Sequence, residues 1–110
     1  MAHLIKTIRK RATFIMVREK GKNIHGKNFN VQLLENQSLN NLIYVGFTAT
    51  KKLGKVVKRN KAKRIMRELA KKILIKCKTN TYYVLIAKTS ILDIKFKDLL
   101  EELDKIINVK

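Results

Sequence analysis

The residues of this chain that could do chemistry are mainly cationic, and they gather in one segment. Residues 51–78 hold thirteen Lys and Arg side chains against a single acid, Glu68, which leaves a net charge of +12. Helix faces normally mix the two signs, because opposite charges one turn apart stabilise each other. A charge run is a solvated face in most proteins, but an unmixed run of this density predicts a surface that binds a polyanion.

The same segment has the periodicity of an amphipathic helix entered through a basic loop. Its apolar residues recur at alternating spacings of three and four, which is the pattern of one buried stripe: Ala62, Ile65, Met66, Leu69, Ala70, Ile73, Leu74 and Cys77. Lys55, Lys58 and Arg59 crowd the expected N-terminal end, where the helix dipole disfavours cations. A docked phosphate would neutralise these side chains and accept hydrogen bonds from free backbone N–H groups. The segment is therefore better suited to bind phosphate than to be a free helix.

Groups for acid and base catalysis or for metal binding are not paired in the sequence. His3 and His25 are far apart, and each is interpreted as a surface or turn residue. No Gly-rich phosphate loop, nucleophile elbow or Cys-x-x-Cys pair occurs. Cys77, the only cysteine, is interpreted as a reduced packing residue rather than a reactive thiol. An anion-binding surface would exclude the last expected helix, because that helix holds five of the eight acids: Asp93, Asp98, Glu101, Glu102 and Asp104.

The elements that must position the cations form one α+β domain, expected to span residues 1–110. A chain of 110 residues that is 45% hydrophobic can bury one modest core. The patterns predict an extended segment over 1–9, a helix over 10–20, and strands over 28–34, 42–50 and 82–87. The basic helix precedes the last of these strands, and a final helix over 91–109 follows it. A short extra strand near 23–25 is left open. This order predicts a two-layer sandwich. Strand 82–87 is apolar without alternation, so we expect both of its faces to be covered.

Two details concern the first helix and its neighbours. The apolar residues 14–17 are too broad a cluster for one stripe, so one side of the helix should cover the sheet while another lines a groove or is exposed. Gly21 is expected to end this helix. Gly46, in strand 42–50, has no side chain that would obstruct a close approach.

The overall charge indicates the class of partner. A net charge of +18 predicts association with something strongly anionic, nucleic acid first and an anionic membrane surface second. No apolar run is long enough to span a bilayer. The N-terminal residues lack the apolar centre of a secretory signal, and their basic, acid-poor character leaves a transit peptide as a minor alternative. We expect a cytoplasmic protein that does not act at a membrane.

Residues 45–68, VGFTATKKLGKVVKRNKAKRIMRE, resemble the signature of the bacterial ribonuclease P protein component. That signature is a strand ending in Ser/Thr-x-Lys-Lys, then a Gly, then Arg-Asn-Arg-x-Lys-Arg-x-x-Arg. The resemblance continues in LIKTIRKRATFIMVREKG and in TYYVLIAK with the final helix, so it covers nearly all of the chain. Three positions depart from the family: Lys61 stands for the middle Arg of the motif, and Arg18 and Gln32 stand where many members have aromatic residues.

The resemblance implies a fold and a function. The fold would be a two-layer α+β sandwich in the order α-β-β-(β)-α-β-α, with a left-handed βαβ crossover against the general rule and a likeness to the ribosomal S5 domain 2. The function would be that of the protein subunit of ribonuclease P, which removes the 5′ leader of precursor tRNA. The implied partners are the ribonuclease P RNA subunit, in a 1:1 ribonucleoprotein, and precursor tRNA. Catalysis would reside in the RNA, with Mg²⁺ held mainly by RNA and no catalytic or metal-binding residue on the protein.

The resemblance also implies two binding surfaces. The basic helix would bind the RNA subunit through Lys51, Lys52, Lys55, Arg59, Asn60, Lys61, Lys63, Arg64 and Arg67. The cleft between the first helix and the sheet would bind the leader through Phe14, Arg18, Gln32 and Lys88, with Phe14 as a stacking platform. Without the resemblance, Phe14 would be interpreted as a core residue.

Other classes of protein remain open at this point. A ribosomal or ribosome-assembly protein with an S5-like fold would share the charge and the architecture. A DNA-binding or membrane-surface protein would also be basic, but it would have the spacing of the motif only by chance.

Overall fold

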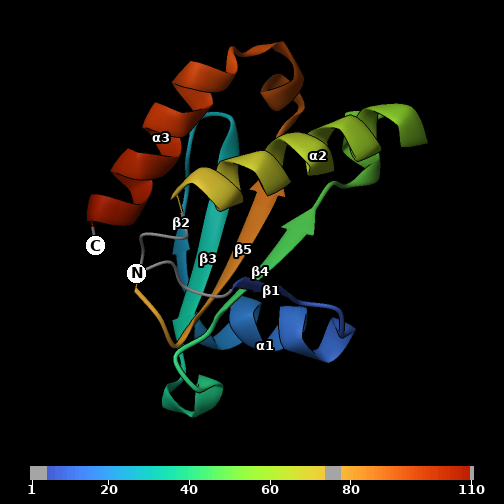
Figure 1. Ribbon diagram of the computed structural model, residues 1–110. Coiled ribbons are helices and arrows are strands. Elements are labelled where there is room, and N and C mark those ends of the chain that lie inside the picture. Colours follow the sequence, from blue (N-terminus) through green and yellow to red (C-terminus); the bar gives the residue numbers. More distant parts are fainter. Residues whose placement is uncertain (1–4, 74–77, 110) are drawn as a thin grey trace.

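The computed structural model describes residues 5–73 and 78–109, which form a five-stranded mixed sheet with helices on both faces (Figure 1). The elements are β1 (Ile5–Thr7), α1 (Arg11–Lys20), β2 (Lys22–Ile24), β3 (Phe29–Glu35), β4 (Ile43–Thr48), α2 (Val56–Ile73), β5 (Thr81–Ala87) and α3 (Phe96–Val109). Short 3-10 helices lie at Gln37–Leu39, Lys51–Leu53 and Thr89–Asp93. The expected order of elements is confirmed, including the short strand β2, and part of the extended N-terminal segment is the strand β1.

The expectation of one continuous helix over residues 91–109 is wrong. Residues Thr89–Asp93 form a 3-10 helix, Ile94 is extended, and α3 begins at Phe96. The apolar spacing runs on across this break, so the periodicity alone did not indicate it. The break turns the chain so that both Ile91 and Leu99 are buried in the core.

The sheet has the strand order β1-β4-β5-β3-β2. Strands β1, β4 and β5 are parallel, whereas β3 pairs antiparallel with both β5 and β2. In Figure 1, β4 and β5 point in the same direction, β5 lies to the left of β4, and α2 crosses in front of them. The β4-α2-β5 connection is therefore left-handed, as the resemblance implies and against the general rule.

The larger core lies between the sheet and the helices α2 and α3. The expected stripe of α2 faces it, with Ala62, Met66, Leu69 and Ala70 buried and Ile65 and Ile73 partly buried. Leu74 and Cys77, the last two residues of that stripe, lie outside the described residues. The stripe is local in the sequence, so its inward face was predictable from spacing alone.

The helix α1 covers the opposite face of the sheet. Its Val17 is buried with Ile8 and Val84, and half-buried side chains from α1, β3, β4 and β5 surround them. Gly21 ends α1 as expected, because its N–H donates to the carbonyl of Val17 at 2.9 Å. A Cβ atom at Gly21 would lie 2.6 Å from the carbonyl oxygen of Leu33, so the helix end approaches β3 more closely than another residue would allow. Both faces of β5 are thus covered, as predicted.

Candidate nucleic-acid interface

The helix α2 and the 3-10 helix before it carry a cationic face that acids of the protein do not balance. The first turn of α2 has no acid. Among the residues assigned to RNA binding, Arg59 and Lys63 are half-buried, and the others are exposed: Lys51, Lys52, Lys55, Asn60, Lys61, Arg64 and Arg67. Within α2, an ion pair joins Lys71 to Glu68 at 3.6 Å, and both side chains are at least half exposed. Such exposed pairs contribute little to stability. Glu68 is the one acid among the cations of this helix, so the face is strongly positive.

One row of this helix turns toward the edge of the sheet. Arg59, Lys63 and Arg67 are spaced by four residues and so lie on the same side of α2. The guanidinium of Arg67 lies 5.7 Å from the ring centroid of Phe47 in β4, which is a cation–π contact. The Nε atom of Arg59 is buried without a hydrogen-bond partner among the described residues. A buried donor left without a partner lowers the stability of the folded state.

A groove runs beside α1 on its face of the sheet, and we call it the α1 groove. It has a volume of about 220 Å³, and it is lined by Arg11, Phe14, Ile15, Arg18, Gln32, Thr48, Val84 and Ile86. The strand register explains its floor, since Gln32, Val84 and Gly46 lie side by side in one row, and Asn30, Ile86 and Thr48 in the next. Its lining combines an aromatic ring with two guanidinium groups and contains no carboxylate or imidazole.

A second hollow of about 450 Å³ adjoins the α1 groove at the edge of β4, and we call it the edge hollow. Arg11, Phe14 and Thr48 line both spaces. The edge hollow adds Arg9, Phe47 and Ala49, together with Lys63 from α2. The sequence suggested two separate surfaces, but in the structure the cationic side of α2 and the groove beside α1 meet here.

Three of the four residues expected at the leader cleft lie together. Phe14 and Arg18 line the α1 groove from the helix, and Gln32 lines it from β3, although Gln32 is only 8% exposed and presents little surface. Lys88 lies elsewhere. Its ammonium donates to the carbonyl of Gly26 at 2.6 Å and its backbone N–H donates to the carbonyl of Asn28 at 3.0 Å.

Lys88 instead shares a different hollow with Lys52, of about 350 Å³, at the end of β5. The β2–β3 turn holds its ammonium, which therefore does not extend into the α1 groove. Ile86 lines both spaces, so Lys88 lies next to the groove rather than in it.

The sequence interpretation missed several groove residues. Arg11 and Ile15 lie seven and three residues before Arg18 on α1, a helical spacing that would have indicated them once Arg18 was chosen. Thr48 has no such signal, because it reaches the groove only through the pairing of β4 with β5.

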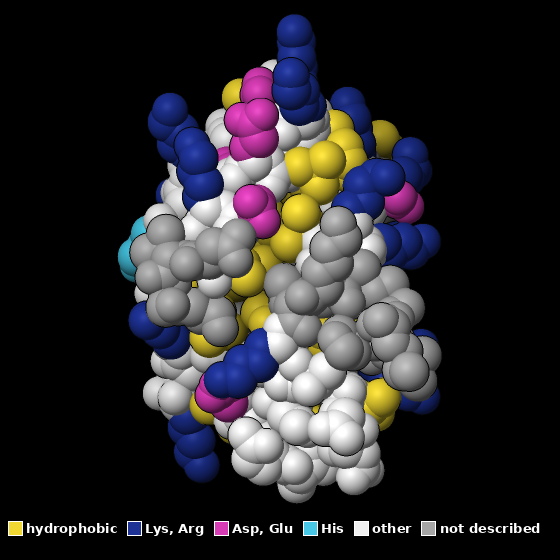
Figure 2. All heavy atoms as spheres, turned by 60° about the vertical axis from the view of Figure 1, so that its left-hand side comes forward, with side chains coloured by type: hydrophobic (Ala, Val, Ile, Leu, Met, Phe, Trp, Pro, Cys, Tyr) yellow, Lys and Arg dark blue, Asp and Glu magenta, His cyan; other side chains and the backbone are white. Residues whose placement is uncertain are grey.

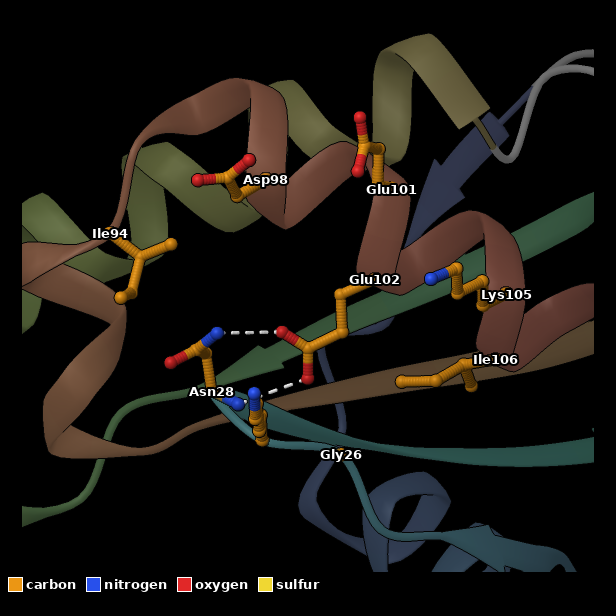
Figure 3. A pocket seen from close by; sticks show the side chains of 9 residues that line it. Gly26, Asn28, Ile94, Asp98, Glu101, Glu102, Lys105 and Ile106 are labelled. Atoms are coloured by element: carbon orange, nitrogen blue, oxygen red, sulfur yellow. Dashed lines mark hydrogen bonds between the residues drawn. The ribbon is translucent and has the colours of Figure 1, made fainter.

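The side of the molecule that carries α3 is less suited to phosphate. Figure 2 shows this side, on which acidic side chains lie among Lys and Arg side chains with apolar atoms between them. A hollow of about 650 Å³ lies between α3 and the β2–β3 turn, and Asp98, Glu101 and Glu102 are in its lining. Figure 3 shows Glu102 directed at Asn28, from which it accepts hydrogen bonds from the side chain at 2.8 Å and from the backbone N–H at 3.0 Å. Lys27 and Lys105 also line this hollow, so its charges are mixed and slightly acidic, unlike those of the cationic face of α2.

The described residues offer neither a metal cage nor a membrane span. Within residues 5–73 and 78–109, no three His, Cys, Asp or Glu side chains are grouped so that they could hold a metal ion. Over the same residues, no helix combines the length and the apolar character that crossing a bilayer requires.

Comparison with known proteins gives one consistent result. The profile of the family described as Ribonuclease P matches residues 5–109. The ribonuclease P protein component of Syntrophus aciditrophicus is 34% identical over 96 residues, covering 87% of this chain and 79% of that protein. The corresponding protein of Symbiobacterium thermophilum is 31% identical over 99 residues, covering 90% of this chain and 85% of its own length.

Solved structures agree with these relatives. The RNase P protein of Staphylococcus aureus superposes with a TM-score of 0.81 at 26% identity, over 94% of this chain and 93% of that one. The RNase P protein from Thermotoga maritima has the same fold, with a TM-score of 0.80 at 22% identity over 96% of this chain and 98% of that one.

Proposed function

The chain belongs to the ribonuclease P protein family, and we propose that α2 binds the RNA subunit of the enzyme while the α1 groove binds the unpaired 5′ leader of precursor tRNA. Ribonuclease P is the endoribonuclease that processes the 5′ end of tRNA, and its protein component works with an RNA subunit. The matches to this family favour that function over a ribosomal or ribosome-assembly role.

The observation that carries the proposal is the uncompensated charge of α2 beside an aromatic groove. Phosphate contacts supply affinity and orientation without reading sequence. The exposed Lys61, Arg64 and their neighbours, on a rigid helix of 18 residues, fit such a role.

The α1 groove has the chemistry of a single-strand site. Unpaired bases bind by stacking on aromatic rings while cations contact the backbone. Phe14 supplies the ring, and Arg11 and Arg18 supply the cations from the same helix. Many family members have aromatic residues at positions 18 and 32, so this chain would depend on Phe14 more than they do. In this proposal Lys88 lies next to the groove and does not line it, because its ammonium donates to the carbonyl of Gly26.

We further propose that the RNA subunit carries out catalysis and holds most of the Mg²⁺. The α1 groove and the edge hollow present cations, threonine and apolar side chains, with no group in their lining that could serve as a general base. Through its net charge of +18, the protein would reduce the repulsion between two RNAs. We place this 1:1 ribonucleoprotein in the cytoplasm, with precursor tRNA.

Cleavage of precursor tRNA by the RNA subunit, with and without the protein, tests the proposal across a Mg²⁺ series. The benefit of the protein should be greatest at low Mg²⁺ and shrink as Mg²⁺ screens the phosphates. A benefit that does not depend on Mg²⁺ contradicts the electrostatic account. Cleavage by repurified, nuclease-treated protein without RNA contradicts catalysis by the RNA subunit.

A further inference from the structure

The helix α1 leaves a second space on its face of the sheet, on the far side from the α1 groove. Phe14 covers the row formed by Gly46 and Val84. The α1 groove lies over the row that follows along the strands, Thr48 and Ile86. On the other side of the Gly46 and Val84 row lies the row of Tyr44 and Tyr82, which lines a separate hollow of about 320 Å³. We call this space the tyrosine hollow.

The two tyrosines form an aromatic wall. They are direct partners in the parallel register of β4 and β5. Their ring centroids lie 5.6 Å apart with the planes tilted by 44°. Both are half-buried, because they pack against the small cluster of Ile8, Val17 and Val84 and still line the hollow. Packing accounts for the covered side of each ring and leaves the other side available to a ligand.

Cations stand at the rim of the tyrosine hollow. Arg9 and Lys10, between β1 and α1, line it and are exposed. Neither takes part in an ion pair with another described residue. The rest of the lining is apolar or hydroxylic, with Leu39 and Thr13 among it and no carboxylate. Two aromatic rings beside two unpaired cations are the combination that an unpaired nucleotide requires.

We propose that the tyrosine hollow binds an unpaired RNA nucleotide, with its base against Tyr44 and Tyr82 and its phosphate at Arg9 and Lys10. The inference rests on the proposed RNA-binding function and adds a second single-strand site to it. A volume of about 320 Å³ suits one nucleotide. A base within a duplex is stacked on its neighbours and has no free face, so the ligand is a loop, a bulge or a strand end.

The nucleotide has two possible sources with the same chemistry. The α1 groove and the tyrosine hollow lie on either side of α1, so a long leader could reach both. An unpaired nucleotide of the RNA subunit would bind in the same way. Binding of each RNA to ring-deletion variants distinguishes these sources.

The first measurement uses the protein's own fluorescence. The chain has three tyrosines and no tryptophan. Tyr83 is fully buried, so changes in emission on binding report on Tyr44 and Tyr82. Titration of the Phe14→Leu protein, whose α1 groove lacks its ring, with a short oligouridylate should still quench the tyrosine emission to saturation. Unchanged emission while a labelled oligouridylate binds would overturn the proposal.

The second measurement compares variants by anisotropy of a labelled oligouridylate, all in the Phe14→Leu background, so that the α1 groove contributes no stack. Tyr44→Leu/Tyr82→Leu keeps apolar packing but removes the rings, and its affinity should fall about 5- to 100-fold for the loss of one base stack. Tyr44→Phe/Tyr82→Phe keeps the rings and should bind like the parent protein. Thermal unfolding of both variants checks that they are folded. Equal affinity of the folded Leu and Phe variants would overturn the proposal.

The same variants assign the source. If the Leu variant binds the RNA subunit more weakly when no precursor tRNA is present, the nucleotide belongs to that subunit. A loss seen only with holoenzyme and precursors that have long leaders assigns it to the leader. Leu and Phe variants that behave alike toward both RNAs overturn this inference but leave the proposed function intact. Failure of the parent protein to bind the RNA subunit at all would contradict the proposed function itself.

Discussion

The ring of Phe14 lies directly on the backbone of Gly46. A Cβ atom built at Gly46 would lie 2.4 Å from Cε1 and 2.6 Å from Cζ of that ring. This packing joins α1 to β4 between the α1 groove and the tyrosine hollow. Phe14 is thus partly a packing residue and partly exposed groove lining, which reconciles the two interpretations that the sequence left open.

Replacing Gly46 with Ala should displace this ring. The added methyl group overpacks the space beneath Phe14, so we expect unfolding free energy to fall by about 1–3 kcal/mol. Urea unfolding would measure the decrease. The matched control is the same change in a Phe14→Leu background, where a smaller side chain leaves more room and the decrease should be smaller. An equal decrease in both backgrounds would show that the clash does not involve Phe14.

Phe14→Leu should weaken binding of precursor tRNA by the holoenzyme. Leucine keeps most of the packing on Gly46 but offers no aromatic face, so the expected loss is roughly 1–3 kcal/mol for one stack. Binding of mature tRNA, which lacks the leader, should hardly change. Met16→Leu, on the same helix but outside the α1 groove lining, is the control. An equal loss for both tRNAs would argue against leader recognition.

The charge of α2 should appear in the salt dependence of RNA binding. Arg59→Ala/Arg64→Ala should lower affinity for the RNA subunit and flatten the plot of log K against log salt, by about 0.7 to 0.9 for each phosphate that the protein no longer neutralises. The control is Lys95→Ala/Lys97→Ala, two exposed cations near the start of α3. If both double variants change the slope equally, the effect reflects net charge rather than an interface at α2.

The hydrogen bonds between Asn28 and Glu102 should matter for stability but not for RNA. Asn28 is 8% exposed, and its backbone N–H and amide both donate to this carboxylate. Glu102→Ala leaves those donors unpaired, so unfolding free energy should fall by about 1–3 kcal/mol. Glu101→Ala, on the exposed part of the same helix, should change it by less than about 0.5 kcal/mol.

RNA affinity of these two variants, measured well below the unfolding temperature, checks the second half of this prediction. It should equal that of the parent protein. A specific loss of RNA binding in Glu102→Ala would mean that the β2–β3 turn, which also holds Lys88, positions part of the interface.

Much of the candidate interface was predictable because it depends on local periodicity. The stripe of Ala62, Met66 and Leu69 determines which side of α2 is buried, and the opposite side then has to carry the cations. The same holds for Phe14 and Arg18, which one helix places on the same groove. Residues three or four apart are neighbours on a helix whatever the rest of the fold does.

The tertiary structure alone decided where residues from different strands and turns meet. Tyr44 lies beside Tyr82, and Thr48 beside Ile86, only because β4 and β5 pair in parallel in one register. Lys88 was expected in the leader cleft, but packing of the β2–β3 turn against the end of β5 places its ammonium at Gly26. A strand's alternation indicates which side chains share a face. It does not indicate which strand lies next to it, because those pairings are made between residues far apart in the chain.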